Sequence, residues 1–419
     1  MNSPQRSKRL RRDFGVSAQS SRLEVADIFR AYGPAYRAAH DLPLPHLKVM
    51  SAIEKCRTEA LGGHVDECDT CGYRHPFYNS CRNRHCPTCG ALERAKWLAA
   101  RQGDLLPVMY FHVVLTLPDD LNPVALVNQR VIYRILFRAG SEALQALGRD
   151  PKHLGGEIGV LATLHTWGQN MLDHPHLHCI VTGGGLSADG QRWVLPKKAK
   201  KKNGRRKKFF IHVNVISDLF KKKFLAYLQE AYDSGDLKFV GKTAALESPE
   251  AFKKLKAALY AKKWVTYCKA PFGGPEQVLA YLAGYTHRVA ISNHRLIKIE
   301  GGKVFFKWRD YRDGKTKVMR LEPFEFIRRF LMHVLPGNFY KIRYYGIWSN
   351  CHRKTKLKRC QEILGVATAP EALPSPAFNW EDWLCELTGI DPRLCPKCGK
   401  GRMVTREILP AVKAVPKTG

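Results

Sequence analysis

Apolar and polar residues alternate along several short stretches of this 419-residue chain, and in the stretches between them apolar residues recur every three or four positions. Alternation is typical of half-buried strands, and the longer period is typical of amphipathic helices. Strands are expected at residues 108–117, 159–167 and 176–182, with a three-stranded meander over 294–321. Helical patterns cover residues 22–61 (interrupted at Gly33-Pro34 and around Pro43 and Pro45), 92–102, 122–147, 217–234, 249–262, 275–284 and 324–335.

The chain is strongly basic, because 69 Lys and Arg residues stand against 37 Asp and Glu residues and give a formal net charge of +32. Such an excess predicts a polyanionic partner, and binding to nucleic acid would weaken steeply with salt. An anionic membrane surface is the alternative, but the longest apolar run, residues 105–118, is shorter than the ~20 residues of a spanning helix. No apolar segment follows the basic N-terminus, so we expect no secretory signal, no membrane partner and a cytoplasmic, nucleoid-associated protein.

Positive charge is concentrated in the segment PKKAKKKNGRRKK, residues 196–208. We expect a mobile loop there, followed by a strand at FFIHVNVI, residues 209–216. The run could be only a solvated surface, or it could contact the phosphate backbone without sequence specificity. Its candidate DNA-binding residues are Lys200, Lys201, Lys202, Arg205 and Arg206.

His176 and His178 stand two positions apart in the segment HPHLH. Side chains alternate across a strand, so both imidazoles would lie on one face and could bind one divalent metal. If residues 159–167 pair with this strand, His165 shares that face and is the first candidate for a third ligand. The other candidates are Gln277 and His112. In so basic a chain the pattern suggests metal-assisted cleavage of DNA, although an incidental polar strand would have the same spacing.

Five of the thirteen cysteines lie between residues 68 and 89. An odd count without a secretory signal disfavours disulfides and favours metal ligands. The spacing C-x2-C-x14-C-x2-C predicts one structural Zn²⁺ site, because four protein ligands leave no open position for chemistry. Its expected ligands are Cys68, Cys71, Cys86 and Cys89, and the residues that could replace one of them are Cys81 and His85. The module could contact DNA, or its zinc could serve only the fold.

A second close pair, Cys395 and Cys398, resembles half of a zinc knuckle. Such a pair supplies only two of the four ligands that a structural zinc needs. The missing half could be Cys385 or a histidine, and the sequence leaves open whether this pair binds metal.

An enzyme that rejoins the DNA it has cut must conserve the energy of the broken phosphodiester bond, and a nucleophile that forms a covalent bond to the phosphate does so. Attack by tyrosine leaves a covalent phosphotyrosine, which a free hydroxyl can later reverse. Three pairs have the spacing Tyr-x3-Tyr, which puts both phenols on one helix face: Tyr32/Tyr36, Tyr281/Tyr285 and Tyr340/Tyr344. The spacing alone does not choose among them. The segment PEQVLAYLAGYTHR around Tyr281 and Tyr285 offers an expected helix start and small residues beside the tyrosines, whereas two core tyrosines would be the structural alternative.

Four blocks of the chain resemble, in the same order, the insertion-sequence 91 family of two-tyrosine HUH rolling-circle transposases. They are SCRNRHCPTCG, FHVVLTLP, HPHLHCIVTGGGLS and YLAGYTHRVAISNHRL. The resemblance spans roughly residues 25–350, and it does not extend with any clarity to the lysine-rich loop or to the C-terminal CPKCG.

The resemblance implies that His176 and His178 are the metal pair, that Tyr281 and Tyr285 are the nucleophiles, and that the cysteine module is an N-terminal zinc domain. It leaves the third metal ligand open. Arg288, which follows the tyrosines, is a further candidate for phosphate contact. The implied fold class is α+β, with an HUH-endonuclease core whose central antiparallel sheet is flanked by helices, plus the small zinc-binding module.

The implied function is that of a bacterial DNA transposase. It would cut and rejoin single-stranded DNA through a 5′-phosphotyrosine, with Mg²⁺ or Mn²⁺ on the histidines polarising the phosphate. Its partners would be single- and double-stranded DNA at the element ends and target. The alternatives are a plasmid replication initiator or relaxase, and a non-catalytic zinc-dependent DNA-binding protein, which would leave the histidine strand and the tyrosines without a role.

A chain of this length should hold two or three domains. The expected ranges are a flexible basic arm at 1–21, a helical and zinc-binding domain at 22–95, a nuclease domain at 96–350 with the basic loop inserted, and a C-terminal region with the CxxC element at 351–419. No internal repeat of solenoid length is evident.

Overall fold

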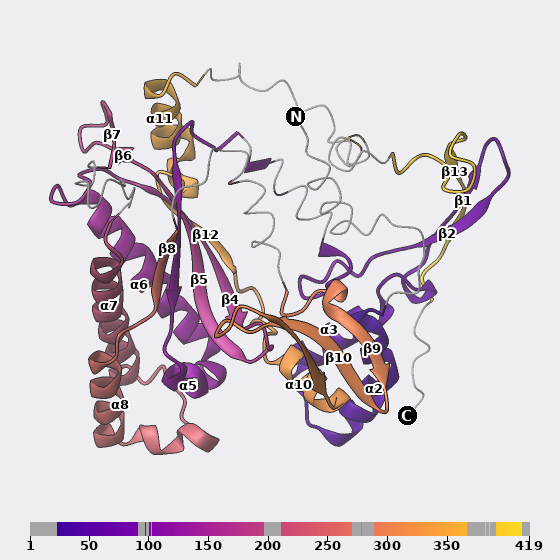
Figure 1. Ribbon diagram of the computed structural model, residues 1–419, viewed down its shortest axis with the longest axis horizontal. Helices are drawn as coiled ribbons and strands as arrows, with labels where there is room; N and C mark the ends of the chain where they lie inside the picture. Colours follow the sequence, from indigo (N-terminus) through magenta and orange to yellow (C-terminus); the bar gives the residue numbers. More distant parts are fainter. Residues whose placement is uncertain are drawn as a thin grey trace. The chain divides into compact units, whose positions relative to one another are not determined.

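The computed structural model describes residues 23–90, 97, 100–101, 103–196, 211–269, 278, 289–366, 382, 385 and 391–412 (Figure 1). The chain forms two compact units. The first comprises Met1–Ala99, His287–Val334 and Ala372–Gly419, and the second comprises Ala100–Thr286 and Leu335–Glu371. Each unit therefore gathers segments that are distant in sequence, whereas the ranges expected from the sequence are consecutive blocks.

The second unit is built on a five-stranded sheet in which every neighbouring pair is antiparallel. In order across the sheet the strands are β12 (Ile342–Gly346), β4 (Gly159–Trp167), β5 (Asp173–Thr182), β3 (Tyr110–Thr116) and β8 (Thr266–Lys269). The strands β4 and β5 form the expected hairpin. With its helices, this sheet confirms the predicted α+β fold with a central antiparallel sheet.

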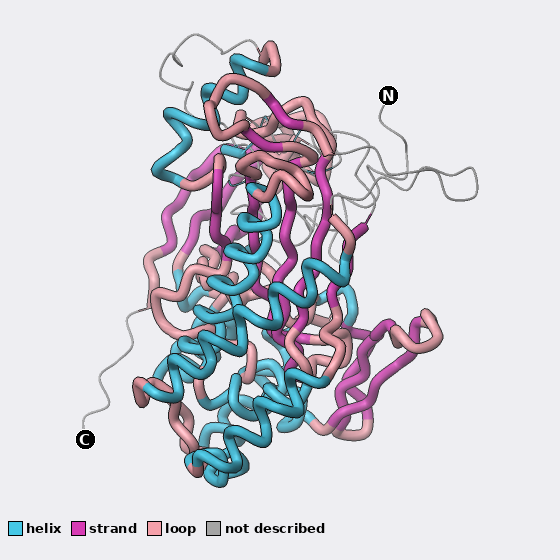
Figure 2. The backbone as a smooth tube through the Cα atoms, turned by 90° about the vertical axis from the view of Figure 1, so that its left-hand side faces the viewer, coloured by secondary structure: helices cyan, strands magenta, loops and turns pink. Residues whose placement is uncertain are grey.

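Helices lie on one side of this sheet, as Figures 1 and 2 show. They are α5 (Asn122–Val127), α6 (Gln129–Arg149), α7 (Val213–Asp233) and α8 (Pro249–Ala261). Every second strand residue points toward them, so Leu164 and Leu177 are buried in one core with Phe137 and Phe220. Each buried CH₂ group contributes about 0.8 kcal/mol, so this face holds the unit together.

In its described residues, the first unit combines three helices with two small antiparallel sheets. The helices are α2 (Val25–Ala39), α3 (Leu44–Lys55) and α10 (Pro323–Leu331). Phe29 of α2 and Phe330 of α10 meet edge to face with ring centroids 5.2 Å apart. The first sheet has the order β13 (Met403–Leu409), β1 (Gly63–Cys68), β2 (Arg74–Tyr78), and the second has the order β11 (Thr316–Leu321), β10 (Lys303–Arg309), β9 (Leu296–Glu300).

The second of these sheets confirms the meander expected over residues 294–321. Gly301 and Gly302 form its first turn with φ of +54° and +69°, a region that glycine enters without strain. Among the residues that the structure describes, the remaining short elements are β6 (Gly185–Leu186), β7 (Trp193–Val194), α11 (Lys358–Ile363), five 3₁₀ turns (Glu59–Leu61, Asp119–Leu121, Gly241–Glu247, Asn293–Arg295, Asn350–His352) and a π turn (Arg353–Leu357). In the described part of the chain, no helix has both the length and the apolar character needed to cross a membrane.

Two local expectations are wrong. Helix α2 continues through Pro34, because the proline removes only one backbone hydrogen bond while Phe29 and Tyr36 hold the buried side of the helix. Helix α7 begins at Val213, inside the expected strand, where the ring nitrogen of His212 accepts the Asn214 N–H at 3.3 Å and caps the first turn. The helices expected at residues 92–102 and 275–284 lie almost wholly outside the described residues.

Asp173, at the start of β5, is an uncompensated buried carboxyl. Neither of its oxygens has a hydrogen-bond partner among the described residues, and the same is true of the nearby Tyr133 hydroxyl. Burial raises the pKa of Asp173 to about 7, with a smaller contribution from the Asp119 carboxylate. The folded chain therefore keeps a proton on Asp173 that the unfolded chain loses near pH 3.9.

The Asp173→Asn variant should be more stable than the parent protein at pH 8, by roughly 2–4 kcal/mol. The free energy of unfolding of the parent should fall as pH rises from about 4 to about 7, because unfolding then releases the Asp173 proton. The neutral amide cannot ionise, so the variant lacks this loss. Urea unfolding at a series of pH values measures the effect, and Asp218→Asn, at an exposed position, is the control. Parallel pH profiles for the parent and Asp173→Asn would contradict the prediction.

Candidate functional site

Three histidines meet on the sheet face opposite to the helices. His165 comes from β4, and His176 and His178 come from β5. Their sequence neighbours Leu164 and Leu177 point into the helix-covered core, so alternation places the imidazoles on the other face. The register pairs His165 directly with His176, which confirms the expectation that all three share one face.

The three side chains are close enough to bind one ion. One potential ligand nitrogen on each lies within 4.8 Å of the other two, and the Nε2 atoms of His176 and His178 are 3.1 Å apart. Two nitrogens bound at about 2.1 Å to one ion are about 3.0–3.4 Å apart, so this separation fits a shared divalent metal. Three protein ligands leave positions open for a phosphate, which is typical of catalytic metal sites.

Hydrogen bonds and stacking orient these rings. His176 Nδ1 lies 2.6 Å from the backbone oxygen of His174, so this nitrogen donates its proton and Nε2 keeps a lone pair. Burial lowers the pKa of His176 to about 4, with a smaller contribution from His174, and so favours the neutral imidazole that a metal requires. His165 stacks on Trp167 with ring centroids 4.6 Å apart.

His112, the other described candidate for a third ligand, lies on β3 behind His178. Its Nε2 is 2.9 Å from His178 Nδ1, and the two rings stack with centroids 5.1 Å apart. Burial lowers the pKa of His112 to about 3, with contributions from Lys269 and His176, so the ring is neutral and its Nε2 can accept a hydrogen bond. A proton on His178 Nδ1 donated to His112 leaves the His178 Nε2 lone pair facing His176.

The other predicted residues of this site lie outside the described part of the chain. They are Gln277, Tyr281, Tyr285, Arg288, Lys200, Lys201, Lys202, Arg205 and Arg206. The roles of the tyrosines as nucleophiles, and of the basic residues as DNA contacts, stay predictions.

Eight of the nine described cysteines of the first unit form two sets of four, whereas the sequence predicted one set. In each set every sulfur lies within 4.8 Å of the others. The first set is Cys56, Cys81, Cys86 and Cys89, and the second set is Cys68, Cys71, Cys395 and Cys398. The predicted grouping of Cys68 and Cys71 with Cys86 and Cys89 is therefore wrong.

The β1–β2 hairpin separates the two halves of the predicted grouping. Cys68 ends β1 and lies at the hairpin turn. At the other end, the Arg57 N–H donates to the Asn79 oxygen at 3.1 Å, which brings Cys81 beside Cys56. Strands of five and six residues, rising about 3.3 Å per residue, put roughly 15–20 Å between the ends of the hairpin, which one ion cannot span.

Only part of this arrangement had a signal in the sequence. Cys81 was a recognised substitute ligand, but Cys56 lies 25 positions before it and has no close cysteine partner that would indicate a metal site. The pair Cys395 and Cys398 meets the hairpin turn, and neither Cys385 nor a histidine supplies its missing half.

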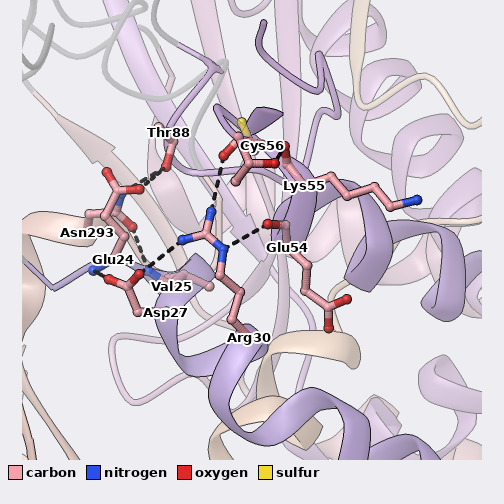
Figure 3. Close-up of polar contacts among 10 residues, drawn as sticks. Glu24, Val25, Asp27, Arg30, Glu54, Lys55, Cys56, Thr88 and Asn293 are labelled. Carbon is pink, nitrogen blue, oxygen red and sulfur yellow. Dashed lines mark hydrogen bonds and ion pairs between the residues drawn. The ribbon is translucent and has the colours of Figure 1, made fainter. Parts of the chain in front are cut away.

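Hydrogen bonds fasten the first cysteine set to helix α2, as Figure 3 shows. Arg30 of α2 donates from Nη2 to the Cys56 carbonyl at 3.2 Å. Thr88, which precedes Cys89, donates from Oγ1 to a carboxylate oxygen of Glu24 at 3.1 Å. Cys56, at the end of α3, and the loop that carries Cys89 are therefore both held against α2. This preorganises the set for a structural Zn²⁺.

Comparison with protein families identifies the class of this chain. Residues 28–117 match the family described as "Transposase zinc-binding domain", and residues 159–356 match the family described as "Putative transposase". The chain belongs to the insertion-sequence 91 family of transposases, with an N-terminal zinc-binding domain. Membership implies a DNA strand-cutting and strand-transfer activity with DNA as the partner.

Two relatives are similar over most of their length. The chain is 50% identical over 397 residues to "Putative transposase y4qJ" of Sinorhizobium fredii, a match that covers 94% of this chain and 97% of the relative. It is 25% identical over 365 residues to "Transposase for insertion sequence element IS801" of Pseudomonas savastanoi pv. phaseolicola, which covers 86% of this chain and 84% of the relative. No solved structure matches the chain.

Removing His112 should weaken metal binding without removing a ligand. The His112→Ala variant takes away the acceptor 2.9 Å from His178 Nδ1, so we expect the affinity of the histidines for Mn²⁺ to fall about 10–100-fold. Titration calorimetry measures this affinity. His153→Ala changes a histidine of the same unit outside the cluster and should leave it unchanged. Parental affinity in His112→Ala would mean that His112 does not orient His178.

Proposed function

We propose that this transposase is an HUH-type endonuclease that cuts and rejoins single-stranded DNA, with His165, His176 and His178 holding the catalytic divalent ion. The convergence of the three imidazoles on one sheet face is the observation that supports this most. Mg²⁺ or Mn²⁺ bound there would polarise the scissile phosphate. The two cysteine sets are closed by four protein ligands each, so the histidines are the described cluster that suits an open, catalytic metal.

Tyr281 and Tyr285 are the proposed nucleophiles, and both lie within the matched transposase region. Attack of a tyrosine oxygen on phosphorus breaks the bond to the 3′ oxygen and leaves a 5′-phosphotyrosine. The phenol gives up its proton and the departing 3′ oxygen takes one up, so the phosphate bond energy is conserved. The second tyrosine can cut a second strand, and each free 3′-hydroxyl can then attack the other phosphotyrosine to exchange the strands.

Positive charge near the histidines supports DNA as the substrate. Lys269 is exposed on β8 and is paired in register with His112, on the same sheet face as the cluster. A lysine there can neutralise part of the charge of a bound phosphate. Lys200, Lys201, Lys202, Arg205, Arg206 and Arg288 are the further proposed contacts. We propose that single- and double-stranded DNA at the element ends and target both bind, and that the +32 charge favours association with the nucleoid.

Incubation of the protein with Mn²⁺ and a labelled single-stranded element end should give a covalent adduct that survives denaturant. The double change Tyr281→Phe and Tyr285→Phe removes both phenol oxygens, so we expect no adduct by denaturing electrophoresis. The matched control is Tyr311→Phe with Tyr340→Phe, which changes two exposed tyrosines in the described part of the chain and should leave the adduct yield unchanged. An adduct that persists in the Tyr281/Tyr285 variant would refute the nucleophile assignment.

Loss of a metal ligand should separate cleavage from DNA binding. His176→Ala should reduce the cleavage rate by ~100-fold or more while DNA retention on a filter stays within about two-fold, because phosphate contacts supply most of the non-specific affinity. His153→Ala should cleave at the parental rate. A His176→Ala protein that cleaves at the parental rate would remove the histidines from the reaction.

A further inference from the structure

We propose that Cys68, Cys71, Cys395 and Cys398 form a second structural Zn²⁺ site, which fastens the C-terminal segment to the β1–β2 hairpin. The matched zinc-binding domain ends at residue 117, so half of this site lies far outside it. Cys71 faces Cys395, which lies 324 positions later in the chain, and Cys68 faces Cys398, which lies 330 positions later. The C-terminal CxxC element is thus a structural part of the zinc-binding domain.

The distances between sulfurs fit a tetrahedral zinc. Cys68 Sγ lies 3.8 Å from Cys398 Sγ, and Cys71 Sγ lies 3.7 Å from Cys395 Sγ. Four sulfurs at about 2.3 Å from a tetrahedral ion are about 3.8 Å from one another. A disulfide would require about 2.05 Å, so the facing sulfurs are placed as ligands and not as bonded pairs.

The two halves of the site have matching backbones. Each has the pattern C-x2-C-G, and the glycine N–H donates to the first cysteine's carbonyl, at 3.1 Å from Gly72 to Cys68 and at 2.9 Å from Gly399 to Cys395. Gly72 and Gly399 have φ of +68° and +65°, a conformation that favours glycine. Both are therefore tight turns that direct two sulfurs to one side, as a zinc knuckle requires.

The C-terminal half fits closely against the hairpin turn. The Asp69 N–H donates to the Arg402 carbonyl at 3.0 Å, and the Arg402 N–H donates to Asp69 Oδ1 at 2.9 Å. A Cβ on Gly401 would lie 2.5 Å from Cys68 Sγ, so a larger residue at this position would displace the cysteine sulfur. From there β13 pairs with the whole of β1, from Met403 opposite Cys68 to Leu409 opposite Gly63.

This sheet has almost no apolar core of its own. Most of β13 is exposed, including 40% of Val404 and 74% of Ile408. A small sheet without a buried face is marginal in water, and structural zinc commonly supplies the missing stability. Zinc on the four cysteines would therefore hold β13 in place, with help from Arg74, which pairs with Glu407 at 3.4 Å.

Metal content tests the site. When substituted with Co²⁺, the parent protein should show the thiolate-to-cobalt charge-transfer absorption of eight thiolates, and the Cys395→Ser, Cys398→Ser double variant should show half of it. In the zinc form, the double variant should contain one fewer zinc per chain by elemental analysis. The histidine cluster does not contribute to this absorption because it has no thiolate. Cys351→Ser, at an exposed cysteine outside both sets, is the control and should match the parent. Undiminished absorption and zinc in the double variant would overturn the proposal.

A measurement on the unmodified chain covers the case in which the double variant does not fold. Cys71 and Cys351 are both exposed, and Cys398 is partly exposed. In the native protein, iodoacetamide should alkylate Cys351 at once, whereas Cys71 and Cys398 should react only after a zinc chelator is added, as mass spectrometry of the peptides measures. Equal alkylation of the three cysteines before chelation would overturn the site. Neither experiment involves DNA cleavage, so its outcome is independent of the proposed nuclease activity.

Discussion

The second unit depends on one strand register, in which His165 of β4 lies opposite His176 of β5. Because strand side chains alternate, this register sends Leu164 and Leu177 into the helix-covered core and all three histidines to the other face. A slip of one residue would exchange the two faces, burying imidazoles against helices and exposing leucines. The hydrophobic effect that stabilises the unit therefore also fixes the geometry of the candidate metal centre.

The first unit depends on a different kind of interaction. Its helices have a small aromatic core around Phe29 and Phe330, but the sheet of β13, β1 and β2 buries little apolar surface. Sulfur clusters stand at the two ends of the β1–β2 hairpin, and segments from both ends of the chain contribute to them. Directional contacts by a few side chains replace a continuous core in this part of the molecule.

Local patterns in the sequence were sufficient for much of the fold. Alternation located β4 at its observed bounds and β3 within a few residues, and the glycine pair at 301–302 located a turn of the meander. The same rules were wrong at Pro34 and at Val213. In both places packing outweighs local preference. At Pro34, burial of the helix face around Phe29 stabilises the helix by more than the lost hydrogen bond costs. At Val213, burial of Ile216 outweighs the preference of β-branched residues for strands.

The sequence by itself determined the family and located the residues proposed for its chemistry: the histidine pair, its expected third partner, the C-x2-C pairs and the two-tyrosine segment. It could do so because these signals depend on spacings of two to four residues, which a strand or a tight turn converts directly into geometry. Only the tertiary structure decided which cysteine pairs meet and that His112 lies behind His178. Those choices depend on which strands pair across long stretches of chain, and no local spacing encodes the pairing of β1 with β13.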